Sequence, residues 1–175
     1  MNDALRSVTA AELSSAHRLG KALLALNNAD AAQLSWLEPD RLEHLVGQAF
    51  LARRIGEIDT FLLALDQSAD YDSPNFLWFR SRYRRFVYVD RIVVAPSARK
   101  RGYARRLYHD LFEHALKAGH ERVTCEVNIS PPNPQSDAFH TALGFVEVGT
   151  TDVYNGSRTV RYLSRALSMP AATSA

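Results

Sequence analysis

The sequence has little cysteine, no long apolar run and almost no net charge, and each shortage excludes a class of protein. One cysteine, Cys125, excludes an internal disulfide framework and fits a reducing compartment. No stretch approaches the ~20 apolar residues that a transmembrane helix needs. The first residues, Met1–Arg6, lack the basic start and apolar core of a signal peptide. We therefore expect a cytoplasmic protein without a membrane partner.

The charges are nearly balanced, with 21 Lys and Arg against 19 Asp and Glu. A protein that binds duplex nucleic acid usually gathers its Lys and Arg on one face, so we expect no nucleic-acid partner. The histidines lack the spacing of a metal site, and we expect no metal. Cys125 lies among β-branched residues without an adjacent His or Lys, which favours a buried small hydrophobe over a nucleophile.

With 175 residues, of which 46% are hydrophobic, the chain is long enough for one domain with a full core. We expect this domain to cover residues 1–168, followed by a loose tail at 169–175. Residue periodicity and composition predict the helices and strands. The predicted strands are Leu5–Val8, a strand ending near Ile55, Phe61–Leu65, Phe86–Val94, Glu121–Val127, Phe145–Val148 and Thr159–Leu163; the predicted helices are residues 13–26, Pro39–Gln48, 104–116 and Ser136–Leu143.

Three local signals refine this outline. Thr9 and Glu12 have the spacing of a capping box, in which each residue satisfies an amide of the other. The pair Asn155-Gly156 predicts a hairpin between the last two strands. The segment Asp70–Arg85 is too long for an ordinary connection, and its aromatic residues argue against disorder. It either closes over a substrate that carries a carboxylate or a ring, or is a surface loop anchored by its aromatic side chains.

The segment from Ile92 to Leu107 carries the clearest functional signal, because a strand, a glycine loop and a long helix follow one another. The first amides of a helix have no internal partner and lie at the positive end of the helix dipole. Gly102 allows a close backbone approach, and the run Arg99–Arg101 adds positive charge. This arrangement predicts a phosphate site. Its spacing matches neither the nucleotide P-loop nor the dinucleotide fingerprint.

Two segments resemble the GNAT acetyltransferase superfamily. Residues Val93–Ala104 are similar to its acetyl-CoA loop, with the pattern Arg-x-x-Gly-x-Ala from Arg99. Residues Asn133–Phe145 are similar to the family's Asn-x-x-Ala/Ser-x-x-x-Tyr-x-x-x-Gly-Phe segment, with His140 at the Tyr position. The order and spacing of the elements match from about Leu5 to Leu163, so the resemblance covers nearly the whole chain.

The resemblance implies an α/β (α+β) fold that is a single GNAT domain. Its sheet would be mixed, mostly antiparallel, six- to seven-stranded and splayed between strands four and five, with helices on both faces. The resemblance also implies acetyl-CoA as cofactor, with the pantetheine arm along the fourth strand and the pyrophosphate on the glycine loop. The implied cofactor contacts are Ile92, Val93, Val94, Arg99, Lys100, Arg101, Gly102, Tyr103, Ala104, Asn133, Ser136 and Phe139.

Acyl transfer to an amine needs a group that accepts a proton from the amine. Glu126 occupies a strand position that resembles the catalytic Glu of ribosomal-protein N-terminal acetyltransferases. Two extra residues lie between Glu126 and His140, so the alignment is not gapless there. Asp90 shares one strand face with Tyr88 and is the alternative base.

A second group can protonate the departing thiolate, and the family's usual Tyr is replaced here by His140. A neutral imidazole can donate one N–H, whereas the ordinary pKa of His, ~6.5, leaves few imidazolium ions at neutral pH. Tyr154 and Tyr162, on the last strands, are the substitutes.

We therefore expect an acetyl-CoA-dependent N-acetyltransferase that acts on a primary amine of a small or amino-acid-like acceptor by direct attack in a ternary complex. Acetylation of a protein N-terminus or lysine is the alternative reaction, and a non-catalytic acyl-CoA sensor is the alternative of another class. A homodimer is compatible with the sequence. The expected acceptor contacts are Asn27, Asn28, Trp36, Trp78 and Tyr88.

Overall fold

The structure, a computed structural model, describes residues 3–13, 18–31 and 33–168. Within these residues seven strands form one mixed sheet in the order β1-β2-β3-β4-β5-β7-β6. The chain divides into two compact units: residues 1–70 with 89–109, and residues 71–88 with 110–175. Strand β4 (Phe86–Val94) and helix α4 (Tyr103–Lys117) each contribute residues to both units, which are described separately here.

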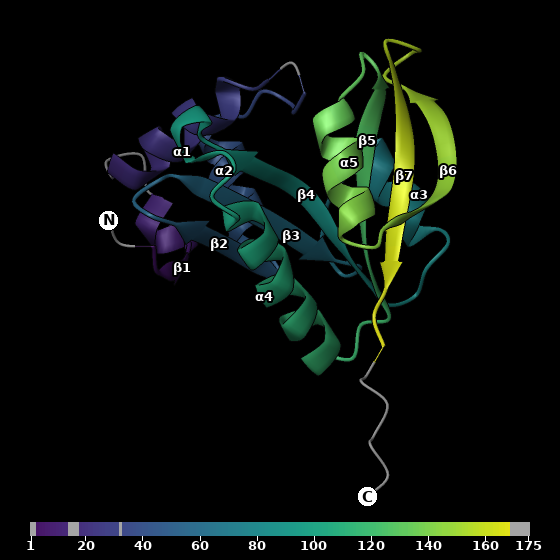
Figure 1. Ribbon diagram of the computed structural model, residues 1–175, viewed down its shortest axis with the longest axis horizontal. Coiled ribbons are helices and arrows are strands. Elements are labelled where there is room, and N and C mark those ends of the chain that lie inside the picture. The colour runs from purple at the N-terminus through teal and green to yellow at the C-terminus, as the bar shows by residue number, and fades with distance from the viewer. Residues whose placement is uncertain (1–2, 14–17, 32, 169–175) are drawn as a thin grey trace, which may run out of the picture. The chain divides into compact units, whose positions relative to one another are not determined.

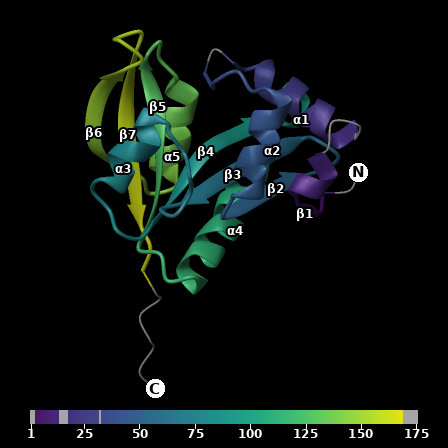
Figure 2. The same cartoon turned by 180° about the vertical axis from the view of Figure 1, so that it is seen from behind.

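The first unit is built on an antiparallel meander, in which β1 pairs with β2 and β2 with β3. Helices α1 and α2 cover one face of these strands, and α4 begins on the opposite face (Figures 1 and 2). Leucines at helical spacing, Leu23, Leu42 and Leu45, are buried in its core. The elements are β1 (Leu5–Ser7), the 3-10 helix η1 (Ala10–Leu13), α1 (Arg18–Asn28), α2 (Pro39–Gly47), β2 (Leu51–Ile55), β3 (Thr60–Asp66) and the short η2 (Pro96–Ala98).

The second unit contains the other half of the sheet, with β7 between β5 and β6 and antiparallel to both. Helix α5 lies on one face of these strands and α3 on the other (Figures 1 and 2). Phe76, Phe79 and Phe86 are fully buried and, with Tyr88, form its aromatic core. The elements are α3 (Pro74–Arg80), β5 (Arg122–Ser130), α5 (Pro134–Ala142), β6 (Val146–Val153) and β7 (Arg158–Ala166).

Strands β4 and β5 are parallel and pair only over Phe86–Tyr88 and Arg122–Thr124. Strand β5 continues to pair with β7 as far as Ser130. The pairing of β4 with β5 therefore stops where the predicted splay begins. The predicted fold class is confirmed: the sheet is mixed and seven-stranded, it parts between the fourth and fifth strands, and helices cover both faces.

The predicted strand Phe86–Val94 agrees with β4 at both ends, because its β-branched run is bounded by Pro96. The segment Asp70–Arg85, predicted as a loop, instead contains helix α3. This helix has seven residues, too few to show a helical period, and Pro74 begins it at a position where its missing N–H has no cost. The prediction of a helix through residues 14–17 and that of a tail at 169–175 fall outside the described residues.

The capping box at Thr9 is formed in part. Glu12 Oε2 accepts from the backbone N–H of Thr9 at 3.0 Å, as predicted. The Thr9 hydroxyl donates to the same carboxylate at 2.9 Å instead of accepting a helix amide. Both bonds hold the start of η1 against the end of β1.

Cys125 lies inside β5 and is 3% exposed, which confirms its reading as a buried hydrophobe. Burial raises the pKa of its thiol well above the ordinary value, and the charge of Glu126 acts in the same direction. Across the described ranges, no helix is long and apolar enough to cross a bilayer, and no three His, Cys, Asp or Glu side chains gather as metal ligands would.

Candidate active site

Three neighbouring positions form a row across the second unit. Glu126 on β5 is paired with Tyr162 on β7, and Tyr162 is paired with Gly149 on β6. Directly paired residues of antiparallel strands lie on the same face of a sheet. The row thus places a carboxyl group and a phenol side by side, next to a position without a side chain.

Asn75 of helix α3 connects the two polar groups of this row. Its Nδ2 donates to Glu126 Oε1 at 2.9 Å, and Tyr162 Oη donates to its Oδ1 at 3.1 Å. Asn75 is 4% exposed and Tyr162 is 1% exposed, so both bonds are shielded from water. One amide side chain therefore fixes the orientation of both the carboxylate and the phenol.

Trp78, one turn further along α3, lies over the phenol. Its ring stacks on that of Tyr162 with centroids 4.2 Å apart and an interplanar angle of 24°. Gly149 makes this possible, because a Cβ atom there would lie 2.7 Å from Cζ2 of Trp78. The guanidinium of Arg82 lies over the same indole, 3.8 Å from the ring centroid. We call Glu126, Tyr162, Asn75 and Trp78 the Glu126 cluster.

Burial raises the pKa of Tyr162 to about 12, and the nearby charge of Glu126 adds to the effect. The phenol therefore keeps its proton at any physiological pH. Within the Glu126 cluster, one residue can accept a proton and another can supply one.

The glycine loop belongs to the first unit. Lys100 and Gly102 have left-handed backbones, with φ of 63° and 76°, which turn the chain sharply into α4. Nothing lies within 4 Å of where a Cβ of Gly102 would be, so this side of the loop is open. Arg106 N donates to Gly102 O at 3.1 Å, so the amides of Tyr103, Ala104 and Arg105 precede the helical hydrogen bonds.

With this geometry in place, the chain can be compared with known proteins. The acetyltransferase (GNAT) family model matches residues 74–145, which include both the glycine loop and most of the Glu126 cluster. The match covers less than half of the chain, and over these residues the chain is similar to the GNAT acetyltransferases. The donor of that family is acetyl-CoA. No curated protein sequence matches the chain.

Solved structures share the fold of this chain. The ribosomal-protein-S18-alanine N-acetyltransferase from Escherichia coli is 17% identical, with a TM-score of 0.67 over 100% of this chain and 99% of that one. The structure of yncA from Salmonella typhimurium with its cofactor acetyl-CoA is 18% identical, with a TM-score of 0.69 and the same coverage. The NatC complex bound to Gag peptide and CoA is 12% identical, with a TM-score of 0.72 over 96% and 100%.

The glycine loop fits the chemistry of acetyl-CoA. Its free amides and the exposed side chains of Arg99, Lys100 and Arg101 are donors suited to a pyrophosphate. The Tyr103 hydroxyl is used elsewhere, since it donates to Asp3 at 2.6 Å, so Tyr103 can offer its backbone N–H. Ile92 and Val94 are half-buried on β4, whereas Val93 between them points into the core.

The predicted contacts on α5 have internal partners. Asn133 caps the helix by accepting from Ser136 N at 3.2 Å. Phe139 is half-buried and meets the His140 ring edge-on. These contacts fix the start of α5, where Asn133, Ser136 and Phe139 are half-buried.

His140 is 2% exposed. Its Nδ1 lies 2.8 Å from the Ser136 carbonyl oxygen, which can only accept, so Nδ1 carries the proton of the neutral ring. Burial lowers the pKa of His140 from its ordinary value, and this favours the neutral form. With its N–H used inside α5, the neutral ring has none left to protonate a thiolate.

Asp90, the alternative base, is held in a buried ion pair in the first unit. Arg91 Nε lies 2.6 Å from Asp90 Oδ2, and both side chains are at most 3% exposed. Arg91 also donates to Asn27 Oδ1 at 2.7 Å and lies 3.4 Å from Ser35 Oγ. Asp90 and Asn27 thus take part in a network around Arg91. The sequence offers a local ion pair between Asp90 and Arg91 on a solvated strand face as an alternative, but it does not indicate the burial of this pair or its link to Asn27.

The other expected acceptor contacts differ in accessibility. Asn28 is bonded to both backbone groups of Leu37, accepting from its N–H and donating to its carbonyl, each at 2.9 Å. Trp36 is 64% exposed and donates to Glu38 at 2.7 Å. Tyr88 is 1% exposed among the aromatic rings of the second unit. Of the five, Trp78 belongs to the Glu126 cluster. Asn75 was not predicted, and the sequence signal that could have found it is its place in the same short aromatic segment as Trp78.

Proposed function

We propose that this enzyme transfers an acetyl group from acetyl-CoA to the primary amine of a small or amino-acid-like acceptor. Glu126 is the proton acceptor and Tyr162 the proton donor. The observation that carries the proposal is the chain of hydrogen bonds from Glu126 through Asn75 to Tyr162. This chain of hydrogen bonds holds a proton acceptor and a proton donor within one buried network.

Glu126 suits the amine half of the reaction. An amine is protonated at neutral pH and must lose that proton before it can attack. A carboxylate attracts the ammonium form and can take its proton directly or through one water molecule. Asn75 fixes the carboxylate by occupying Oε1, which orients the group and reduces the entropy lost on binding.

Tyr162 is suited to protonating the departing thiolate. When bound, acetyl-CoA supplies an acetyl group activated as a thioester. A phenol whose pKa is about 12 holds its proton at Oη until a strongly basic atom comes close. On the donor side, the cations Arg99, Lys100 and Arg101 and the first amides of α4 would hold the pyrophosphate.

Packing of α3 favours a small acceptor. Trp78 stacks on Tyr162 and Arg82 covers the indole, so part of the strand face beside Glu126 is already occupied. The resemblance of Glu126 to the base of ribosomal-protein N-terminal acetyltransferases favours a protein N-terminus as the second candidate. The one cysteine, in its reduced and buried form, supports a cytoplasmic location for either reaction.

The test is thiol release from acetyl-CoA, measured across a panel of small primary amines and a panel of peptides. With the best amine, Glu126→Gln is expected to lower kcat/KM by about 10²-fold or more, the usual contribution of a positioned base. Glu121→Gln, which removes an exposed carboxylate just before the same strand, is the matched control and keeps wild-type activity.

Each outcome has a clear consequence. Activity on peptides alone would replace the small acceptor with a protein one. No thiol release on either panel, with CoA still bound tightly, would make the protein an acyl-CoA sensor. Full activity of Glu126→Gln from acidic to neutral pH would remove Glu126 as the base.

A further inference from the structure

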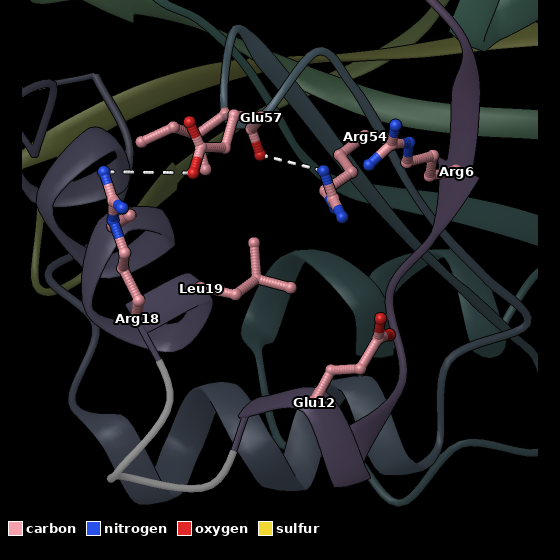
Figure 3. A pocket seen from close by; sticks show the side chains of 8 residues that line it. Arg6, Glu12, Arg18, Leu19, Arg54 and Glu57 are labelled. Carbon is pink, nitrogen blue, oxygen red and sulfur yellow. Dashed lines mark hydrogen bonds and ion pairs between the residues drawn. The ribbon is translucent and has the colours of Figure 1, made fainter.

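A pocket of about 420 Å³ lies in the first unit, and none of the residues that line it is a predicted cofactor, acceptor or catalytic residue (Figure 3). Its walls come from β1, η1, α1, the end of β2 and the turn that follows β2. Three arginines, two glutamates and three aliphatic side chains line it. A cavity of this size accommodates a small metabolite.

Two of the arginines face each other across strands. Arg6 on β1 is directly paired with Arg54 on β2, and both line the pocket. Figure 3 shows the two guanidinium groups on the same side of it. Like charges directly opposite on an antiparallel pair repel and destabilise the sheet. Such a pair is stable when an anion lies between the two groups.

Arg54 is 9% exposed, so its charge is removed from most of the solvent. Its Nη1 donates to the carbonyl oxygens of Gly56 and Glu57, at 2.7 and 3.0 Å. Its Nε is buried and has no hydrogen-bond partner within the described part of the chain. Backbone carbonyls fix the guanidinium without neutralising it, and one buried N–H donor remains for a ligand.

The glutamates of the pocket do not compensate these two charges. Glu12 Oε2 accepts both hydrogen bonds from Thr9. Glu57 lies 3.9 Å from Arg18, with side chains 78% and 91% exposed, which makes this a weak pair. Across residues 3–13, 18–31 and 33–168, no ion pair joins a carboxylate to Arg6 or Arg54.

We propose that this pocket binds the oxyanion group, carboxylate or phosphate, of a small metabolite between Arg6 and Arg54. Planar guanidinium forks are suited to such groups, because two parallel N–H bonds match two oxygens. The aliphatic side chains of Leu19, Ala22 and Ile58 would contact the carbon part of the ligand. The site is separate from the glycine loop and independent of the acetylation proposed above.

The experiment titrates inorganic phosphate into the full chain at constant ionic strength, set with chloride, and follows the thermal unfolding midpoint. Phosphate is expected to raise the midpoint of the wild type. Arg6→Gln, on an edge strand at an exposed position, is expected to raise the apparent Kd for phosphate at least tenfold. Arg84→Gln removes an exposed arginine outside the pocket and keeps the wild-type Kd.

A further pair of variants separates this site from the glycine loop. Arg101→Gln is expected to keep the phosphate response at the pocket while weakening CoA binding. Arg6→Gln is expected to weaken the phosphate response and to leave CoA binding unchanged. In chloride alone, Arg6→Gln should unfold no earlier than the wild type, because the repulsion from Arg54 is relieved. An apparent Kd for phosphate that Arg6→Gln leaves unchanged, or a wild type that shows no response, overturns the proposal.

Discussion

Replacement of Tyr162 by Phe tests the assignment of the proton donor, because it removes one hydroxyl and keeps the ring against Trp78. Loss of a positioned general acid lowers kcat by ~10²–10⁴-fold. The KM for the amine should change little, since the stack and Glu126 remain in place. Thiol release measured over a range of amine concentrations separates the two quantities.

The same variant has a second signature in its stability. Below pH 10 Tyr162 is protonated in both the folded and the unfolded state and contributes no pH dependence. Above pH 10 the unfolded chain loses this proton, whereas the folded protein keeps it up to a pKa of about 12. The free energy of unfolding therefore falls as the pH rises, by ~2.7 kcal/mol at most for the difference between the two pKa values.

Denaturant unfolding of the wild type and of Tyr162→Phe, at neutral pH and between pH 10 and 12, isolates this contribution. At neutral pH the variant should be less stable by ~1–3 kcal/mol, because the buried Oδ1 of Asn75 loses its donor. Toward alkaline pH the difference in the free energy of unfolding between the wild type and the variant should narrow. Tyr154→Phe, at a position that is 50% exposed, is the matched control. Unchanged kcat in Tyr162→Phe, or parallel pH curves, would refute the assignment.

Three further predictions concern other residues. Gly102→Glu should weaken CoA binding by at least tenfold in calorimetry, since it places a carboxylate and a strained positive φ at the pyrophosphate loop; unchanged affinity would contradict the loop's role. Gly149→Ala should displace Trp78, cost ~1–3 kcal/mol of stability and shift tryptophan emission, while the exposed Gly156→Ala should leave the emission unchanged. Asp90→Asn should lower the free energy of unfolding by ~3–5 kcal/mol, because Arg91 loses its buried partner. A fall in the kcat of this variant of at least 10²-fold would instead support Asp90 as the catalytic base.

The fold and the glycine loop were predictable because they depend on local patterns. Strand β4 is marked by its β-branched run, and helix α4 by its apolar stripe. Gly119, with its φ of +77°, lies just after the end of α4. Each of these signals depends only on residues that are close together in the chain. The loop around Gly102 is also contiguous in the chain, so its chemistry can be inferred from order and spacing.

The Glu126 cluster could be inferred only in part, because its members are far apart in the chain. Asn75 is 51 residues from Glu126 and 87 from Tyr162, and it lies on a helix too short to show a period. His140 matched the position of the family's Tyr, but a sequence motif does not indicate that Nδ1 of His140 is bonded to the carbonyl of Ser136, one turn earlier. The ion pair of Asp90 likewise depends on how Arg91 folds back along β4, which alternation along a strand does not predict.

The burial of Cys125 has a practical consequence for all of these measurements. Thiol release is commonly read with a reagent that reacts with any accessible thiolate. The protein's one thiol is 3% exposed, and its pKa is held well above the ordinary value. In the folded protein Cys125 therefore does not react with such a reagent, and the signal measures free CoA alone. When the protein unfolds the same thiol becomes reactive, so this assay carries its own internal measure of whether a variant is still folded.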